Sequence, residues 1–192
     1  MARLLKQSLL ITGVIGVVLG VLLTLGAEQF DRLTTTEAFC ADTCHSMQAY
    51  MAEDPVYRNS THRTTASGIQ AGCADCHVPK GLVPATWSHI TDGTRDLLAE
   101  LTRDYSSREA WEERRPSLAY GVRDKLLASD SATCRSCHQR AALKPVRERG
   151  QRQHELADRN GVSCIGCHFD LVHAPVKPRA SFLDKVRVEG DD

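Results

Sequence analysis

The sequence predicts a mainly α-helical and irregular protein, with one N-terminal transmembrane helix followed by a small domain. Residues 7–27 carry no charge, two later stretches repeat apolar residues at intervals of three and four, and no period-two strand pattern persists. At 192 residues the chain has room for one domain with appendages. We divide it into a cytoplasmic N-terminus at 1–7, an anchor at 8–26, a domain at 27–173 and a tail at 174–192.

The uncharged N-terminal run is long enough for one membrane crossing. Arg3 and Lys6 precede it, and a positive flank of this kind keeps the N-terminus in the cytoplasm. The alternative is a cleaved signal peptide, but "LGA" before Glu28 is a poor cleavage site and the apolar run exceeds the usual length. Either way, the chain after residue 29 is exported. We expect a single-pass protein of the inner membrane with its domain in the periplasm.

Composition limits the interior and the partners of this domain. The aromatic content of 5%, with four Phe and two Trp, is thin for a core made only of side chains. Another group is therefore expected to fill part of the interior. The chain carries 24 basic and 24 acidic residues, so no overall basic field favours a nucleic-acid partner.

Two stretches of the domain have the spacing of amphipathic helices. In "WSHITDGTRDLLAEL", residues 87–101, the apolar positions recur every three or four residues. "RPSLAYGVRDKLL", residues 115–127, has the same period, and Pro116 suits the first turn of a helix. The residues after His173 are expected to form a loosely held tail.

Every cysteine of the chain belongs to a pair, and every pair is followed by a histidine. The three regular segments read "CADCH", "CRSCH" and "CIGCH", whereas "FCADTCH" has one additional residue between its cysteines. Cys-x-x-Cys-His is the attachment signature of c-type haem, in which the thiolates bond the vinyl groups and the imidazole lies under the iron. The attachment residues are Cys40, Cys44, Cys73, Cys76, Cys134, Cys137, Cys164 and Cys167.

Two other cysteine chemistries are weaker interpretations. A disulfide framework would not explain the histidines, and zinc knuckles do not require a histidine after each second cysteine. We therefore predict four covalent haem c groups, whose porphyrins form much of the core. Residues 103–159 are rich in arginine and are expected to serve partly as counter-charges for the haem propionates, the alternative being an ordinary solvated face.

The histidines are numerous enough to supply the axial ligands. Four follow the cysteine pairs, namely His45, His77, His138 and His168. Four lie elsewhere, namely His62, His89, His154 and His173. Because each low-spin haem needs a second strong ligand, three such haems would use three of the second set.

These segments resemble the NapC/NirT/NrfH family of membrane-anchored tetrahaem quinol dehydrogenases, from the anchor to His173. "FCADTCHSM" resembles the first haem site of the family, "SGIQAGCADCHVPK" the second, and "CIGCHFDLVH" the fourth. "TCRSCH" followed by His154 resembles the third site in the NapC branch. Two features depart from the family, the additional residue between Cys40 and Cys44, and His89 where a lysine often stands.

The resemblance implies a set of iron ligands. It implies that Met47, rather than His45, binds the first iron, and it pairs His77 with His173, His138 with His154, and His168 with His62. Met47 and His45 are too close in sequence to reach opposite faces of one haem, so at most one of them binds. We hypothesise that the additional residue shifts the helical phase and eases displacement of His45 by Met47. The residues themselves leave the choice open.

The resemblance also implies a quinol site beside the first haem. Asp96 is similar to the acidic residue of the family's site, and His89, two turns earlier on the same helix face, could hydrogen-bond the quinol ring oxygen. The alternative for Asp96 is a solvated helix residue. No other metal motif or nucleophilic constellation remains, so terminal substrate chemistry is not expected.

The sequence therefore predicts electron transfer from the membrane quinone pool to a periplasmic oxidoreductase, with quinol as substrate. Two alternatives stay open. The protein could reduce quinone with electrons from a periplasmic donor such as a hydroxylamine-oxidising enzyme, or it could be a plain periplasmic shuttle. Whether copies associate as a homo-oligomer is also open.

Overall fold

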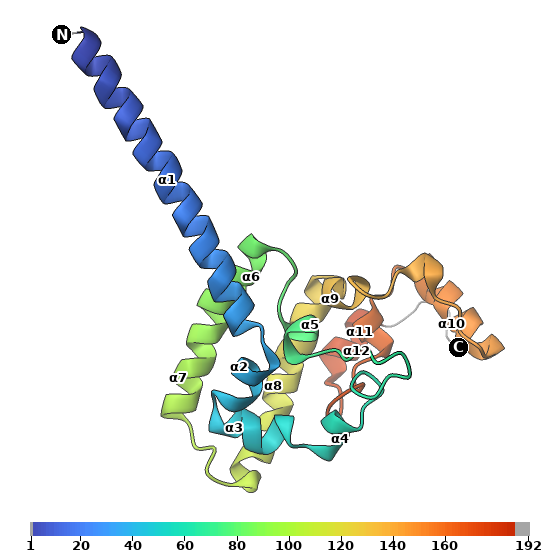
Figure 1. The fold of residues 1–192 in the computed structure, drawn as a ribbon. Helices are drawn as coiled ribbons and strands as arrows, with labels where there is room; N and C mark the ends of the chain where they lie inside the picture. The colour runs from blue at the N-terminus through green and yellow to red at the C-terminus, as the bar shows by residue number, and fades with distance from the viewer. Residues whose placement is uncertain (1, 187–192) are drawn as a thin grey trace.

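The structure, a computed structural model, describes residues 2–186, and it consists of helices joined by irregular segments. No strand occurs among these residues. One long helix, α1, projects from a domain formed by the rest of the chain (Figure 1). The predicted fold class, a mainly helical protein with one N-terminal apolar helix, is confirmed.

Helix α1 (Ala2–Thr34) contains the only segment, among the described residues, that is long and apolar enough to cross a membrane. Residues Leu5–Thr34 form this segment, and none of its most apolar window is buried against the domain. The helix continues eight residues beyond the predicted anchor end at 26, and its last part packs against α2 and α6. The anchor and the domain are thus joined by one rigid element.

The segment after the anchor forms five short helices with clear local causes. These are α2 (Glu37–Asp42), α3 (His45–Met47), the π-helix η1 (Gln48–Ala52), α4 (Pro55–Arg58) and α5 (Cys73–His77). The side chain of Thr36 accepts a hydrogen bond from the Phe39 N–H and starts α2. Asp54 caps α4 in the same way, and Pro55 suits its first turn.

The predicted helix at 87–101 is present, but it is not uniform. It comprises α6 (Leu82–Ser88), the π-helix η2 (His89–Gly93) and α7 (Thr94–Thr102) in direct succession. The apolar side chains that predicted it stay exposed, at 66% for Trp87, 56% for Leu97 and 74% for Leu101. This face is therefore not part of the protein core.

Helix α8 (Arg108–Ala128) begins earlier than the sequence predicts. The side chain of Ser107 accepts a hydrogen bond from the Ala110 N–H, and this cap starts the helix. Pro116 consequently lies inside α8, so its predicted place in the first turn is wrong. A proline there removes one backbone hydrogen bond, which the remaining turns of the helix must offset.

The C-terminal part contains α9 (Ala132–Arg135), the 3₁₀-helix η3 (Arg140–Ala142), α10 (Glu148–Arg159), α11 (Cys164–Cys167) and α12 (Ala180–Val186). Phe182 of α12 is 2% exposed, and its ring meets the edge of Phe169 at 6.1 Å. The prediction of a loosely held tail is therefore wrong for α12, because an aromatic contact holds it. Residues 187–192 of that tail lie outside the described residues.

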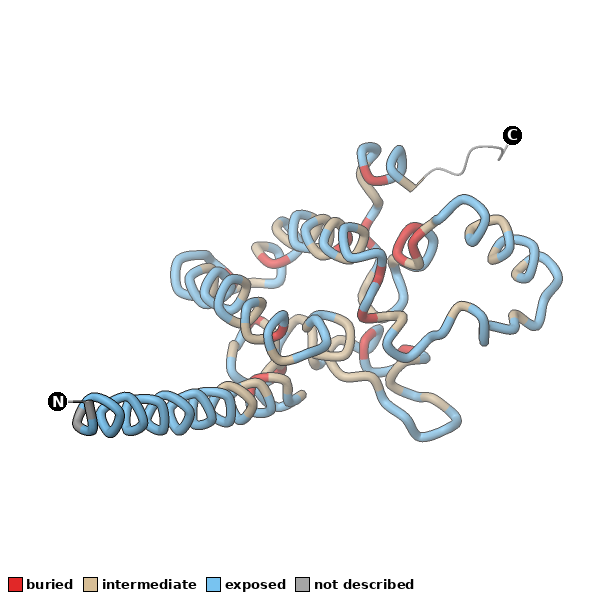
Figure 2. Tube along the Cα trace, turned by 90° about the horizontal axis from the view of Figure 1, so that it is seen from above, coloured by how far each residue is buried: buried red, intermediate tan, exposed pale blue. Residues whose placement is uncertain are grey.

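The side-chain core of the described residues is small and scattered. Figure 2 shows the buried segments as separate short patches instead of one continuous centre. The buried apolar residues are Ala41, Tyr57, Ala85, Tyr105, Trp111, Ile165, Val176 and Phe182. This agrees with the expectation that side chains alone do not fill the interior.

Candidate functional site

The four cysteine pairs lie on or beside the short helices α2, α5, α9 and α11. All eight cysteines are free thiols of intermediate or full exposure, so the predicted attachment atoms are available. In α5 and α11 one helical turn spans the whole pair, and residues three apart lie on the same helix face. Two thiols on one face of a helix are suitably placed to bond the same planar porphyrin.

The first pair is built differently. Helix α2 ends at Asp42, and Cys44 has an extended backbone, with φ −110° and ψ 128°, before α3 begins at His45. The additional residue therefore interrupts the helix, which is a larger change than the phase shift hypothesised from the sequence. The turn that carries His45 and Met47 is oriented separately from the turn that carries Cys40.

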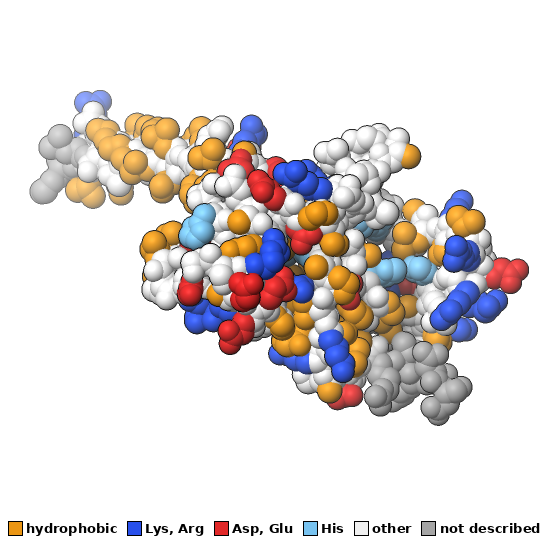
Figure 3. All heavy atoms as spheres, turned by 90° about the horizontal axis from the view of Figure 1, so that it is seen from below, with side chains coloured by type: hydrophobic (Ala, Val, Ile, Leu, Met, Phe, Trp, Pro, Cys, Tyr) orange, Lys and Arg blue, Asp and Glu red, His pale blue; other side chains and the backbone are white. Residues whose placement is uncertain are grey.

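Three pairs of histidine rings face each other at the spacing of axial ligands. The ring centres are 6.2 Å apart for His77 and His173, 6.1 Å for His62 and His138, and 6.1 Å for His154 and His168. One iron between two imidazole nitrogens, each about 2 Å away, puts ring centres about 6 Å apart. Figure 3 shows several histidine side chains gathered in a hollow of the domain. The residues present thus fit three bis-histidine haems.

Two of the pairings implied by the resemblance are exchanged. His77 lies with His173 as expected, but His138 faces His62 and not His154, while His168 faces His154 and not His62. The reason is the course of the chain, which brings His154 and His62 to other cysteine pairs than the resemblance implies. Helix α10 carries His154 to the fourth pair, and the irregular segment after α4 brings His62 to the third.

The local environment keeps several of these rings neutral, which is the form that binds a metal. Burial, and next Lys125, lowers the pKa of His77. Burial and the neighbouring His77 lower the pKa of His173 to about 4. Burial, followed by the nearby His154, lowers the pKa of His168.

The first and second cysteine pairs are in direct contact. Helix α2, which carries Cys40, packs against α5, which carries Cys73. The Glu37 carboxylate accepts hydrogen bonds from the Cys73 N–H, at 2.9 Å, and from the Tyr57 hydroxyl. Although burial raises the pKa of Glu37, these hydrogen bonds and the charge of Arg63 lower it overall. Glu37 thus stays ionised and joins the two sites.

The remaining pairs are connected in chain order. The Thr133 hydroxyl, before the third pair, donates to the carbonyl of Cys76 at 3.0 Å. The buried hydroxyl of Ser131 lies 2.6 Å from that of Ser163 and accepts from the Ile165 N–H, at 3.0 Å, inside the fourth pair. The four attachment segments therefore form a continuous series from the first to the fourth.

A carboxylate from α7 organises the turn that follows the first cysteine pair. Glu100, 13% exposed, accepts from the Ser46 N–H at 3.2 Å and from the Ser46 hydroxyl at 2.6 Å. Its Oε1 atom also lies 2.9 Å from Nδ1 of His45. His45 faces no second imidazole among the described residues, in contrast to the other motif histidines. Within the described residues, the first cysteine pair therefore has one imidazole beside it, whereas each of the other three pairs has two.

His89 lies against the end of the membrane anchor. Its Nδ1 atom is 2.9 Å from the carbonyl of Ala85 and 3.6 Å from Oδ1 of Asp31, and its ring meets the edge of Phe30 at 5.9 Å. Asp31 and Phe30 belong to α1. The sulfur of Cys40 lies 3.7 Å from the carbonyl of Thr34, at the end of the same helix.

Asp96 does not share a face with His89 as the sequence predicts. The prediction assumed an unbroken α-helix, but η2 lies between the two residues, and a π-helical turn contains more residues than an α-helical one. Asp96 is 70% exposed and pairs with Arg95 at 3.5 Å. Asp96 lies one turn before Glu100, which contacts His45 and Ser46 after the first pair. Burial, then Glu100 and Asp96, raises the pKa of the Cys44 thiol.

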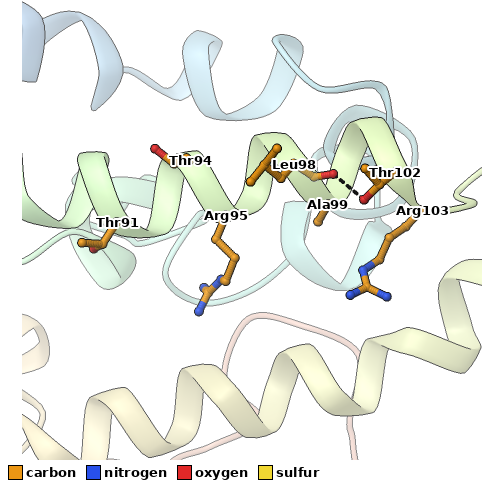
Figure 4. Close-up of a pocket in the computed structure, with 7 residues that line it drawn as sticks. All are labelled: Thr91, Thr94, Arg95, Leu98, Ala99, Thr102 and Arg103. Carbon is orange, nitrogen blue, oxygen red and sulfur yellow. Dashed lines mark hydrogen bonds between the residues drawn. The ribbon is translucent and has the colours of Figure 1, made fainter.

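A shallow pocket of ≈ 350 Å³ runs along one side of η2 and α7 (Figure 4). Arg95 and Arg103 point the same way from the helix, while Thr94 and Leu98 point away from them. The pocket contains none of the predicted ligands of haem or quinol. It is therefore distinct from the candidate site.

Three carboxylates of the site were missed in the sequence, namely Asp31, Glu37 and Glu100. Each acts on residues distant in the chain, since Glu37 bonds Cys73 and Glu100 bonds Ser46. Neither spacing nor a motif marks such partners, because only the packing of α1, α2 and α7 brings them together.

Comparison with known proteins gives a consistent result. Residues 3–178 match the family described as the NapC/NirT cytochrome c family, N-terminal region. The chain is 41% identical over 181 residues to a tetrahaem cytochrome c-type protein of Nitrosomonas europaea, covering 92% of this chain and 73% of that protein.

Two further relatives have similar coverage. A tetrahaem cytochrome c-type protein of Allochromatium vinosum is 39% identical over 150 residues, which are 77% of this chain and 79% of that protein. The denitrification system component NirT of Stutzerimonas stutzeri is 30% identical over 166 residues, 83% of this chain and 79% of that protein. No solved structure matches the chain.

Proposed function

The chain belongs to the NapC/NirT cytochrome c family, as a membrane-anchored tetrahaem electron-transfer protein, and we propose that it oxidises quinol and passes the electrons to a periplasmic redox enzyme. When bound, each haem supplies an iron that takes up and gives back one electron. We propose that the domain lies in the periplasm, since Arg3 and Lys6 flank the anchor on its N-terminal side.

The chain supplies ligands for four haems. We assign His77 with His173 to the second, His138 with His62 to the third, and His168 with His154 to the fourth, on the ring spacing of 6.1 to 6.2 Å. The eight cysteines hold the haems covalently. At the first site, we assign Met47 as the iron ligand, a weak thioether that suits a site without a second imidazole.

One observation carries the quinol part of the proposal. The first cysteine pair and His89 both lie at the domain end of α1, where Cys40 is 3.7 Å from Thr34 and His89 is 3.6 Å from Asp31. A lipid-soluble quinol would reach this end first, because α1 is fixed in the membrane. The first haem is thus the entry point for electrons.

Quinol oxidation also releases protons that the chain must accept. One quinol gives up two electrons, which reduce two ferric irons, and two protons. We assign His89 and Asp96 as the two acceptors, one for each hydroxyl. His89 contacts Asp31 of α1, whose last residue Thr34 lies beside Cys40. Asp96 lies one turn before Glu100 on α7, and Glu100 contacts Ser46 and His45.

The fourth haem is the proposed exit. Helix α10, which carries His154, lies at the opposite end of the domain from α1 (Figure 1). Lys and Arg side chains gather at the end away from the anchor (Figure 3). Within the predicted arginine-rich span, Arg114 Nε and Arg123 Nη1 are buried without a hydrogen-bond partner in the described part of the chain, and they are available to haem propionates.

The test uses the full-length protein in liposomes. Addition of a ubiquinol or menaquinol analogue should reduce its haems, followed as the rise of the ferrous absorption band. A plain shuttle would be reduced by dithionite and not by quinol. If the reduced protein instead converts added quinone to quinol faster than it accepts electrons, the reverse direction replaces the proposal.

A further inference from the structure

The surroundings of His89 determine which of its ring nitrogens is free. A carbonyl oxygen only accepts hydrogen bonds, so the contact of 2.9 Å with Ala85 requires Nδ1 to carry the hydrogen. Nε2 is then the unprotonated nitrogen and is able to accept a proton. The ring is held firmly, since the His89 side chain is 13% exposed and Phe30 packs against it.

The Asp31 carboxylate stands on the same side of the ring. Its Oδ1 atom lies 3.6 Å from Nδ1 of His89, is buried and has no hydrogen-bond partner within residues 2–186. A buried carboxylate oxygen without a partner is costly, because it has lost its hydration without compensation. A positive charge on the neighbouring imidazole would supply that compensation.

We propose that Asp31, in the part of α1 that follows the membrane anchor, is a positioning residue for quinol oxidation, which makes His89 an effective proton acceptor. This inference rests on the proposed function. Nε2 of His89 accepts the proton of one quinol hydroxyl while one electron reduces the iron of the first haem. The second proton goes to Asp96 and the second electron to another ferric iron. Asp31 stabilises the imidazolium through its charge and holds the ring for the transfer.

This assignment gives the last turns of α1 a role in the reaction. Helix α1 would contribute a charged group to the quinol site, in addition to fixing the domain at the membrane. It also explains why α1 continues as a helix to Thr34, beyond the apolar run, since Asp31 must reach the junction of α6 and η2.

The test compares Asp31→Asn with Glu28→Gln in liposomes. Glu28 is a matched control, since it lies one turn earlier on α1 and pairs with Arg32 at 2.6 Å. Asp31→Asn should slow haem reduction by a short-chain ubiquinol by about tenfold, less than the ~10²-fold expected for loss of the base itself. Glu28→Gln should retain the parent rate, and Asp31→Glu should recover most of it.

A reductant that gives electrons without protons, reduced methyl viologen, separates a chemical role from a structural one. It should reduce the parent and Asp31→Asn at equal rates. Equal loss with both reductants, or a quinol rate for Asp31→Asn that equals that of Glu28→Gln, would overturn the inference. If the parent itself is reduced by methyl viologen and not by quinol, the proposed function fails instead.

Discussion

The imidazole rings of His154 and His168 lie 6.1 Å apart, centre to centre, although 13 residues separate them in the chain. This pairing predicts how many low-spin haem signals each histidine variant loses. Replacing His154 by Ala should remove one low-spin bis-histidine signal from the electron paramagnetic resonance spectrum. The variant His154→Ala/His168→Ala should also lose only one signal, because both residues serve the same iron.

The control is the double variant His154→Ala/His138→Ala, which should lose two signals because His138 pairs with His62. If this variant loses one signal and the His154→Ala/His168→Ala variant loses two, the pairing implied by the sequence is correct. The count does not depend on whether a haem without its ligand stays attached.

The buried serine that joins the third and fourth sites should matter for stability. Ser131 is 0% exposed, and its hydroxyl accepts from the Ile165 N–H at 3.0 Å. Ser131→Ala would leave that buried N–H without an acceptor, which costs about 1–3 kcal/mol of the free energy of unfolding. Ser129→Ala should change it by less than about 0.5 kcal/mol, because Ser129 is exposed. Equal denaturation midpoints for the two variants would contradict this.

Local patterns in the sequence were enough for the apolar N-terminal helix, for helical structure at 87–101 and 115–127, and for the cysteine pairs. Their causes are local, namely an apolar run, a period of three to four residues, and short motifs. The axial pairing was not accessible, because His62 lies in an irregular segment and no local pattern specifies where α10 carries His154. The same holds for Asp31 and Glu100, which meet His89 and Ser46 only after α1 and α7 have packed.

Errors at particular residues had physical causes as well. Pro116 suggested a helix start, but Ser107 caps the helix nine residues earlier. His89 and Asp96 were placed on one face because a seven-residue spacing is two turns of an α-helix, whereas a π-helical segment intervenes. The tail after His173 has no pattern that marks a packed helix, yet Phe182 is buried and α12 packs against α11.

Substitution of two methionines, one at a time, tests which residue binds the iron of the first haem. Met47→Leu should change the spectrum of one haem and lower quinol oxidation, because leucine has similar bulk and no sulfur. Met51→Leu, four residues later in η1, should leave both unchanged. Identical spectra for the two variants would remove Met47 from the ligands and favour His45, which Glu100 already holds at 2.9 Å. The measurement is near-infrared magnetic circular dichroism, in which thioether and imidazole ligation differ.

The anchor should matter for the oxidation rate of a lipid quinol and much less for that of a water-soluble quinol. Removal of residues 1–26 behind a cleavable signal keeps residues 27–34, with Asp31, and should release a soluble domain with all four haems. Its rate with a lipid quinol in vesicles should fall strongly, while a water-soluble quinol should react at nearly the parent rate. Equal loss for both quinols would mean that the deletion damages the site itself.

The role of Asp96 separates a quinol site from a surface that only exchanges electrons. Asp96→Asn keeps the shape of the side chain and removes its capacity to accept a proton. If Asp96 is the second proton acceptor, the variant should retain the spectra of all four haems and slow reduction by quinol by roughly 10²-fold. Asp104→Asn is the control, since Asp104 lies just beyond the end of α7 and bonds only Ser106. The measurement is stopped-flow haem reduction by a quinol analogue in the two variants. If Asp96→Asn and Asp104→Asn are reduced at equal rates, Asp96 is only a solvated helix residue paired with Arg95. The second proton would then pass directly to water.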